Sequence, residues 1–247
     1  MQINLMYHDV YAYDSNESGF LRERDFPYKM KLETFEEHVH KIHDYCELHK
    51  LPRNHVVFSF DDGGKSFYTI IAPILEKYGY KGIFFITTKY INTNTFLSES
   101  EILSLHQRGH IIGTHAHTHE HLYTLSDEDI ENEWKHSIDI LSKIIDTPII
   151  YASIPNGDTS KRVLDNAKKY GIKYIYTSEP TTKISYFKGM EIIGRYVLFA
   201  TSTTDYVLSI ITSSRKRFML SCKRSILKVF KTLLGGYYVK LKNLLFR

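Results

Sequence analysis

The stretch VVFSFDDGG, residues 56–64, places two adjacent carboxylates and two glycines directly after a short apolar run. The run is typical of a β-strand buried on both faces, so the acidic pair falls at the carboxyl end of that strand. Successive side chains of a strand point to opposite sides, and Asp61 and Asp62 therefore point in different directions. Either one carboxylate binds a metal while the other faces a substrate, or the stretch is a turn whose Asp caps the following helix.

Similar strand-like runs recur along the chain and alternate with segments of helical periodicity. Strands are expected at residues 3–7, 56–60, 82–86, 110–113, 148–153, 173–178 and 191–198. Helices are expected after Thr34, before Gly79, between Ser98 and Gly109, after Ser126 and before Gly171. This alternation predicts right-handed βαβ units and an α/β fold with a parallel sheet, either open or closed into a barrel. In both forms the functional residues lie at the carboxyl ends of the strands.

Composition places the chain among ordinary soluble proteins, because 43% of its 247 residues are hydrophobic and 24% are charged. Its length suits one large α/β domain or two small ones. The two cysteines, Cys46 and Cys222, lie far apart and suggest neither a disulfide framework nor a thiolate zinc site. The opening MQINLMYHDV does not resemble a secretion signal, and no run of about 18 apolar residues predicts a transmembrane helix. The expected location is the cytoplasm.

The net charge of +4 is unevenly distributed along the chain. Residues 206–247 carry ten basic residues and no acidic one, so subtracting +10 from +4 leaves about −6 for residues 1–205. Residues 214–236 have a helical pattern with one apolar and one basic face. The apolar face holds Met219, Cys222, Ile226, Val229, Phe230 and Leu233, and the basic face holds Arg217, Arg224, Lys228 and Lys231.

Two interpretations of this tail remain open. One is a helix that lies on the anionic inner face of a membrane, and the other is a helix that packs on the rest of the domain with a solvated basic face. Nucleic-acid binding is disfavoured, because the positive charge is confined to a tail that follows a complete catalytic pattern.

Four histidines alternate in the stretch GTHAHTHEHL, residues 113–122, after the strand expected at 110–113. Neutral imidazole is a common zinc ligand. His115 and His119 fall on one side of a turn, whereas the pair His115 and His117 suits an extended strand, and alternating histidines also occur in surface loops. Two histidines and one carboxylate of the pair at 61–62 make an open three-ligand site with a position left for water. The second carboxylate is then available as a general base.

A third strand end carries the turn SIPNGD, residues 153–158. Pro155 fixes one backbone angle and Gly157 frees another, which predicts a rigid turn. Such a turn can direct the backbone N–H of Asn156 at an oxyanion, although the motif by itself is usually only a turn.

These motifs resemble those of the polysaccharide deacetylase family, which is the NodB homology group or carbohydrate esterase family 4. FSFDDGGKSF (58–67) is similar to the family motif TFDDG, and this implies that Asp61 is the catalytic base and Asp62 a metal ligand. GHIIGTHAHTHEHL (109–122) resembles GHEIGSHTxxHxxL, and this implies that His115 and His119 are the other ligands. The resemblance covers residues 1–180 approximately and implies a distorted (β/α)7-type barrel with mostly parallel strands. A deacetylase domain over 1–205 and a basic amphipathic C-terminal extension over 206–247, with a helical tail, are expected.

The chain departs from the family pattern at two places. Ser153 stands where the family often has an Arg that orients the base, and no late Leu-x-His motif supplies the usual catalytic acid. The stretch MYHDV (6–10) resembles the opening strand of the biofilm poly-N-acetylglucosamine deacetylases. We therefore expect His8 to be the general acid, the alternative being that it only fills the mouth of the barrel.

The resemblance implies a metal-dependent hydrolase that removes an N-acetyl group from an amino sugar of a polysaccharide or lipid-linked glycan during surface-glycan assembly. The expected cofactor is a divalent metal, Zn²⁺ first and Ni²⁺ or Co²⁺ as alternatives. Pro155 and Asn156 are the expected oxyanion turn. A catalytically inactive carbohydrate-binding relative is the second hypothesis, and an amidohydrolase or metallophosphoesterase built on the HxH pair is the third.

Overall fold

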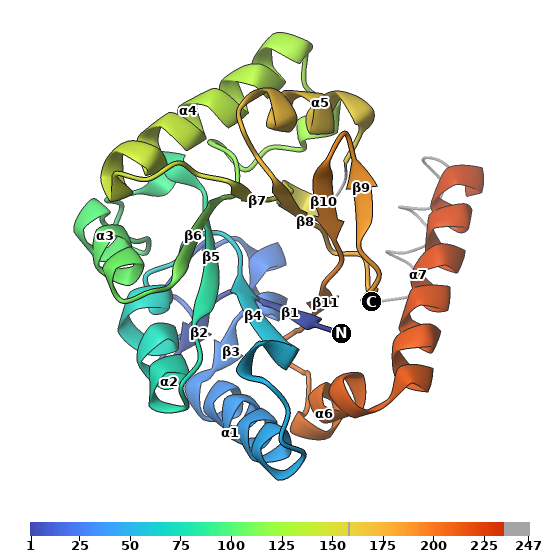
Figure 1. Cartoon of the computed structure of the whole chain (residues 1–247). Coiled ribbons are helices and arrows are strands. Elements are labelled where there is room, and N and C mark those ends of the chain that lie inside the picture. Colours follow the sequence, from blue (N-terminus) through green and yellow to red (C-terminus); the bar gives the residue numbers. More distant parts are fainter. Residues whose placement is uncertain (158, 235–247) are drawn as a thin grey trace.

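The computed structural model describes residues 1–157 and 159–234, with side chains described up to residue 227. A nine-stranded sheet forms its centre, in the order β11-β1-β4-β5-β6-β7-β8-β10-β9. Its strands are β1 (Ile3–Tyr7), β4 (Val56–Phe60), β5 (Gly82–Ile86), β6 (Ile111–Thr114), β7 (Tyr151–Ser153), β8 (Tyr174–Tyr176), β9 (Ser185–Phe187), β10 (Met190–Ile193) and β11 (Tyr196–Val197). All neighbours are parallel except β9 with β10. The sheet curls into an incomplete barrel with mostly parallel strands, as the sequence predicts (Figure 1).

Helices surround the outside of this curl, and α7 runs along the side where the two sheet edges lie (Figure 1). The helices are α1 (Leu32–Leu48), α2 (Ala72–Lys77), α3 (Glu99–Gln107), α4 (Asp127–Ile145), α5 (Lys161–Lys169), α6 (Thr204–Thr212) and α7 (Ser214–Leu234). A two-stranded sheet of β2 (Val10–Tyr11) and β3 (Met30–Lys31) was not expected from the sequence. Single helical turns are η1 (Glu23–Tyr28), η2 (Arg53–His55), η3 (Phe67–Ile71), η4 (Thr88–Tyr90), η5 (Leu122–Thr124) and η6 (Pro155–Gly157).

Capping residues begin α3 and α4 where the sequence predicts, whereas α1 begins at Leu32, before the expected Thr34, without a side-chain cap. The Ser98 side chain accepts a bond from the Glu101 backbone N–H, and the Glu101 side chain accepts one from the Ser98 N–H, which completes a capping box. Ser126 caps α4 by accepting from the Asp129 N–H. The buried stripe of α4 includes Trp134, as its 3.6-residue periodicity predicts.

The single strand predicted at 191–198 is wrong, since β10 and β11 lie at opposite ends of the sheet order. Gly194 and Arg195 connect them. A Cβ at Gly194 would lie 2.3 Å from the Glu179 carbonyl oxygen, so the chain turns where only glycine fits. The apolar pattern of this stretch is continuous, and hydropathy alone therefore does not reveal the break.

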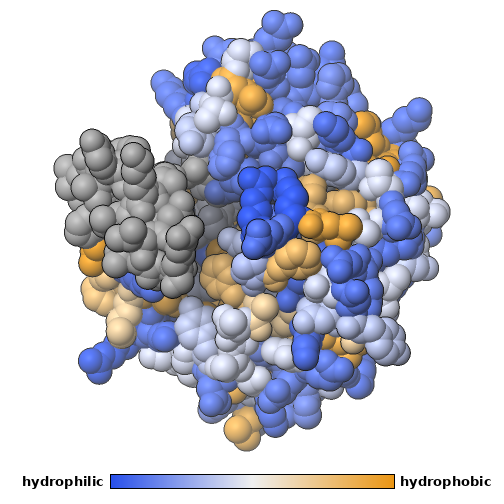
Figure 2. Space-filling model, turned by 180° about the vertical axis from the view of Figure 1, so that it is seen from behind, coloured by the Kyte–Doolittle hydropathy of each residue, from blue (hydrophilic) through white to orange (hydrophobic). Residues whose placement is uncertain are grey.

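Two apolar clusters lie on the two faces of the sheet. The larger one fills the space between sheet and helices, and it includes Val207, Ile210 and Ile211 of α6. Thus α6 crosses the boundary predicted at 205–206 and contributes to the main core. The smaller cluster, Ile83, Phe85, Tyr176 and Ile193, lies on the other face of the strands, inside the curl. On the outer surface, the face seen in Figure 2 is mainly hydrophilic and carries hydrophobic residues in small separate groups.

Candidate active site

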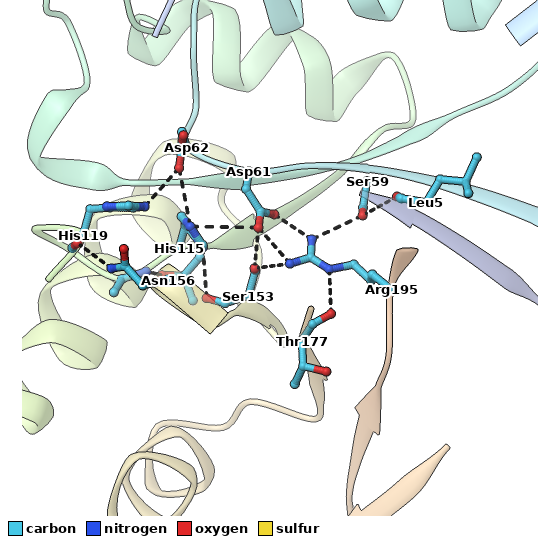
Figure 3. Close-up of polar contacts among 12 residues, drawn as sticks. Leu5, Ser59, Asp61, Asp62, His115, His119, Ser153, Asn156, Thr177 and Arg195 are labelled. Carbon is cyan, nitrogen blue, oxygen red and sulfur yellow. Dashed lines mark hydrogen bonds and ion pairs between the residues drawn. The ribbon is translucent and has the colours of Figure 1, made fainter. Parts of the chain in front are cut away.

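Two carboxylates follow β4 and are both buried. Asp61 is 0% exposed and Asp62 is 6% exposed, and both line a cavity of about 340 Å³. Asp62 and Gly63 have φ values of 88° and 93°, so the chain passes through the left-handed region directly after the strand. A non-glycine residue in that region is strained, and such strain is typical of functional sites. The turn directs the Asp62 side chain away from that of Asp61 (Figure 3).

Two histidines that follow β6 meet Asp62. Asp62 Oδ1 lies 3.1 Å from His119 Nε2 and 3.5 Å from His115 Nε2. One possible ligand atom from each of the three residues lies within 4.8 Å of the others. The structure therefore brings together the carboxylate and the two histidines that the sequence selects (Figure 3).

A hydrogen bond fixes the tautomer of His115. Its Nδ1 lies 3.1 Å from the Ser153 carbonyl oxygen, which can only accept a proton. Nδ1 therefore donates, and the neutral ring keeps a free lone pair on Nε2, the atom that faces Asp62. An imidazole whose other nitrogen is held by a backbone carbonyl is the usual arrangement of a metal ligand.

The same three residues pass a test of fit for a divalent ion. Two nitrogens and one carboxylate oxygen are the donor set of many catalytic zinc sites. The Asp62 Oδ1 atom is buried and makes no hydrogen bond with a described residue, although both histidine nitrogens lie close to it. A cation between these atoms would be bound by the carboxylate oxygen and by both histidine nitrogens.

Asp61 is held by a buried arginine that the sequence analysis missed. The Arg195 guanidinium is 1% exposed and donates to both carboxylate oxygens of Asp61, with Nη1–Oδ1 at 2.6 Å and Nη2–Oδ2 at 2.7 Å. Its Nε donates to the Thr177 carbonyl, and its Nη1 lies 3.3 Å from Ser59 Oγ. Bidentate pairs of this kind fix both the charge and the orientation of a carboxylate (Figure 3).

Ser153 accounts for the departure from the family motif. Its hydroxyl donates to Asp61 Oδ2 at 3.0 Å and accepts from Arg195 Nη2 at 2.7 Å. A small side chain at 153 leaves room for a guanidinium that arrives from the β10–β11 connection. The Asp61 carboxylate is thus oriented by a residue 134 positions further along the chain.

Electrostatics keep the two carboxylates ionised and the histidine neutral. Burial alone would raise the pKa of Asp61, but the charge of Arg195 holds it below its usual value. Burial also opposes ionisation of Asp62, yet His119, with Nε2 at 3.1 Å from Oδ1, lowers the Asp62 pKa. Burial lowers the pKa of His115 to about 4, and Asp61 opposes that shift. A neutral imidazole beside an ionised carboxylate is the state that binds a metal.

The remaining predicted residues lie around the same cavity, with one exception. His8 lines it, and its ring centroid lies 4.5 Å from that of Tyr28. Asn156 also lines it, with φ at 59°, and donates from its side-chain amide to the His119 carbonyl at 3.4 Å. Pro155 is buried beneath this turn and does not line the cavity.

The other two histidines of the cluster separate. His121 lies on the cavity wall. His117 lies away from it, with Nδ1 at 2.9 Å from the Thr88 hydroxyl and its ring against His136. The sequence analysis assigned neither a catalytic role.

Arg195 and Arg224 both lie at the site, and neither belongs to a catalytic motif of the sequence. Arg195 could have been suspected because it is a charged residue within the apolar run EIIGRYVL. Arg224 of α7 lines the cavity and forms an ion pair with Glu179 at 3.2 Å. Nothing local in the sequence indicates that this tail residue reaches the site.

The fold and the site define a curled α/β barrel with an Asp-His-His cluster at the carboxyl ends of its strands. The chain belongs to the polysaccharide deacetylase family, whose sequence model matches residues 49–175, just over half of the chain. That match contains both carboxylates and both histidines, but neither His8 nor Arg195.

Known proteins agree with this assignment. The chain is 28% identical over 125 residues to the peptidoglycan-N-acetylmuramic acid deacetylase PdaA of Bacillus subtilis. The aligned residues cover 50% of this chain and 46% of that protein. It is 30% identical over 92 residues to a chitin deacetylase of Arthroderma benhamiae, covering 37% of this chain and 24% of that protein. The chain spans about half the length of the curated bacterial relatives it matches.

Solved structures share the fold. The Streptococcus pyogenes deacetylase PplD superposes with a TM-score of 0.68 at 21% identity, covering 85% of this chain and 97% of that one. A de-N-acetylase from Aggregatibacter actinomycetemcomitans gives 0.69 at 18% identity, covering 85% and 99%. At these identities the likeness establishes the fold alone.

Proposed function

We propose that the protein is a metal-dependent hydrolase that removes the N-acetyl group from an amino sugar of a polysaccharide or lipid-linked glycan. One observation carries this proposal. A single cavity contains a three-residue donor set and, beside it, a carboxylate that Arg195 and Ser153 hold in place.

In this proposal Asp61 is the general base. Both of its oxygens are bound by Arg195, and Oδ2 also lies 4.0 Å from His115 Nε2, on the side of the metal ligands. Oδ2 accepts bonds from Arg195 Nη2 and from the Ser153 hydroxyl, so it would take a proton from a water molecule on that side when the Ser153 hydroxyl turns away and frees one lone pair. The guanidinium keeps the carboxylate ionised and oriented for that step.

Asp62, His115 and His119 would hold the ion, with Zn²⁺ as the first candidate and Ni²⁺ or Co²⁺ as alternatives. When bound, it would act as a Lewis acid and lower the pKa of a water molecule. The Asn156 turn, set by Pro155, lies on the cavity wall where its backbone N–H can approach an oxyanion, a contact worth about 3 kcal/mol.

His8 is the proposed general acid that protonates the leaving amine. Its Nδ1 is buried and makes no hydrogen bond with a described residue, so nothing in that part of the chain competes for its proton. His8→Ala should lower kcat by about a hundredfold and remove one limb of the pH–rate profile. His117→Ala is the matched control, because His117 lies outside the cavity. An unchanged kcat in His8→Ala would refute the assignment.

Acetate release tests the activity directly. The metal-loaded protein should release acetate from at least one of three substrate sets, namely N-acetylated monosaccharides, oligosaccharides and lipid-linked sugars. Asp62→Ala and His119→Ala should lose bound metal, measured by elemental analysis. No acetate release from any set would favour the alternative of an inactive carbohydrate-binding relative, and unchanged metal content in both variants would refute the ligand assignment.

The helix α7 supports a peripheral contact with an anionic membrane. Phe218, Met219 and Ile226 are exposed on its described part, by 69%, 58% and 55%, and Lys223 is exposed beside them. Arg217 and Arg224 instead turn to the domain, where they contact the carbonyls of α6 and Glu179. These two arginines are therefore not solvated, and the side chains of Lys228 and Lys231, the rest of the predicted basic face, lie outside the described residues. None of the described helices is long and apolar enough to cross a membrane.

Vesicle sedimentation tests this contact. The full chain should bind vesicles that contain phosphatidylglycerol and not vesicles of phosphatidylcholine alone, because apolar insertion and positive charge act together. Replacing Phe218 and Ile226 by Ser should abolish binding, while Leu48→Ser, which alters an exposed apolar residue at the end of α1, should not. Equal binding by both variants would exclude α7 as the contact.

A further inference from the structure

The inside of the curled sheet contains a second group of polar and aromatic residues that the proposed reaction does not use. Phe85 and Tyr176 lie against the Arg195 guanidinium, with ring centroids 5.3 and 5.9 Å from its central carbon. They form a layer that separates the catalytic residues from the amino-terminal half of the strands. Side chains of parallel barrels stack in such layers.

The next layer is an aromatic row set by strand register. Tyr151 of β7 pairs with Tyr174 of β8, and Tyr174 pairs in turn with Glu191 of β10. Glu191 pairs with Tyr186 of the edge strand β9. Residues in register on neighbouring strands point to the same face, so these four side chains form one row across the sheet. Tyr151 and Tyr174 stack, with centroids 4.8 Å apart at 15°.

The row borders an open hollow. Tyr151, Tyr174, Tyr176 and Glu191 line a cavity of about 660 Å³ at the amino-terminal ends of the strands. Tyr186 stands next in the row and is 69% exposed. In a closed barrel, side chains from opposite strands fill this layer. Here the edge strands β9 and β11 do not pair with each other, and the layer stays accessible.

Glu191 has no cationic partner among the described side chains. Its carboxylate makes no ion pair or hydrogen bond with any of them. The two cationic side chains that line the hollow are engaged elsewhere, because Arg53 pairs with Glu47 at 2.8 Å and Lys81 with Glu76 at 3.1 Å. Burial raises the pKa of the Tyr151 phenol, and the negative charges of Tyr174 and Glu191 raise it further. An unpaired carboxylate within an aromatic row is complementary to a cation.

We propose that the row Tyr151–Tyr174–Glu191–Tyr186 binds an organic ammonium group, and specifically the free amine of a de-N-acetylated amino sugar. Aromatic faces attract ammonium groups through their quadrupoles, and a carboxylate beside them adds an ion pair. An N-acetylated sugar is neutral and offers Glu191 no such pair. The choice of ligand rests on the proposed deacetylation, because that reaction would produce the amine. The site is separate from the catalytic cavity and opens at the other end of the strands.

A binding experiment tests the proposal without requiring turnover. The full chain is titrated by calorimetry with a glucosamine tetramer, an N-acetylglucosamine tetramer and choline, and acetate is assayed in the same samples. The glucosamine tetramer should bind at least tenfold more tightly than the acetylated one at the Glu191-dependent site. Choline should bind weakly and depend on the same residue.

Variants distinguish this site from the acidic catalytic cavity. Glu191→Gln keeps the shape of the side chain and should weaken binding of the glucosamine tetramer about tenfold or more. Tyr186→Ser should weaken it about threefold, since this exposed ring can be removed without disturbing the core. Asp139→Asn removes a charge from the exposed face of α4 and is the matched control, which should bind as the unaltered protein does.

The outcomes separate the two proposals. Equal affinity of Glu191→Gln and the unaltered protein for the glucosamine tetramer would overturn the ammonium site. An equal effect of Glu191→Gln on both tetramers would also overturn it. Glu191-dependent binding without any acetate release would support the site and refute the proposed deacetylation instead. Acetate release without Glu191-dependent binding would support the proposed deacetylation and refute the ammonium site.

Discussion

Two layers inside the same curl, with the Phe85–Tyr176 layer between them, surround a carboxylate in opposite ways. At the carboxyl ends, Asp61 is fully buried and receives two bonds from Arg195 and one from Ser153. One layer beyond the Phe85–Tyr176 pair, Glu191 borders an open hollow without a cationic partner among the described side chains. The two levels are about 13 Å apart along the strands, because each layer step spans two residues and a strand rises about 3.3 Å per residue.

The difference shows how closure of the barrel decides whether a carboxylate needs a counter-ion. Where the Gly194–Arg195 connection crosses the curl, water is excluded and a carboxylate needs a dedicated counter-ion. Where β9 and β11 remain apart, the carboxylate borders an open hollow and stays available for a ligand. The same sheet thus presents a fixed charge at one end and an unpaired one at the other.

Removing Arg195 should have the largest effect on the protein. Arg195→Met leaves Asp61 buried without its partner, which should lower the free energy of unfolding by about 3–5 kcal/mol. Glu191→Gln should change it by no more than about 0.5 kcal/mol, because its carboxylate is solvated and unpaired. Urea titration of both variants measures the contrast. Equal stability of the two would mean that the closed layer does not depend on its ion pair.

A double variant separates stability from catalysis in the closed layer. Asp61→Asn alone leaves the Arg195 charge unpaired and should also lose about 3 kcal/mol. Combining Asp61→Asn with Arg195→Met should cost at least 1 kcal/mol less than the sum of the single changes, because no buried charge remains. Acetate release should stay at least a hundredfold below that of the unaltered protein, since the base is absent. Recovery of activity together with stability would exclude Asp61 as the base.

The sequence predicts the elements of this fold well where the signal is local. The strands at 3–7, 56–60 and 82–86 are confirmed at the predicted bounds, because each is a compact apolar run between turns. The helix caps at Ser98 and Ser126 are confirmed for the same reason. The break of 191–198 into two strands is missed, since it depends on the Glu179 carbonyl packing against Gly194.

The site residues likewise divide into those that a local motif predicts and one that it does not. Asp62, His115 and His119 each follow a strand within a few residues, and the parallel sheet brings these strand ends together. Arg195 comes from a connection between opposite ends of the sheet, 134 residues from its partner. No motif spacing encodes such a contact. The serine at 153, in place of the arginine that the family often has, nevertheless indicates that another residue orients Asp61, and Arg195 binds it.

A methyl group added at Gly64 should disturb the closed end moderately. A Cβ there would lie 1.8 Å from Asp9 Oδ1, and that carboxylate already accepts bonds from Ser18 and Ser66. Gly64→Ala should cost about 1–3 kcal/mol of unfolding free energy and lower turnover, because the loop that carries Asp62 must shift. Gly109→Ala is the control at the open end, where the nearest atom to a Cβ is the Lys81 Cε at 3.7 Å. Its backbone strain should lower stability but leave acetate release unchanged, and a loss of turnover there would contradict the separation of the two ends.

The smallest effect concerns the acid stability of the open end, where Glu76 and Glu191 differ in their partners. Glu76 accepts bonds from Arg108 at 2.7 Å and from Lys81 and His110 at 3.1 Å, and these bonds, Arg108 first, lower its pKa to about 2. A lowered folded-state pKa gives stability that is present above the unfolded pKa of about 4.5 and is lost as pH falls towards 2. The fall in the free energy of unfolding towards low pH is called the acid limb here. Glu76→Gln should make this fall smaller by about 1 kcal/mol or less, since the ion pair lies near the surface. Glu191→Gln should leave that limb unchanged, because Glu191 has no ion pair with a described side chain to lose in acid. Urea titrations between pH 6 and pH 2.5 compare the three proteins, and an acid limb that shrinks equally in both variants would show that Glu191 is paired after all.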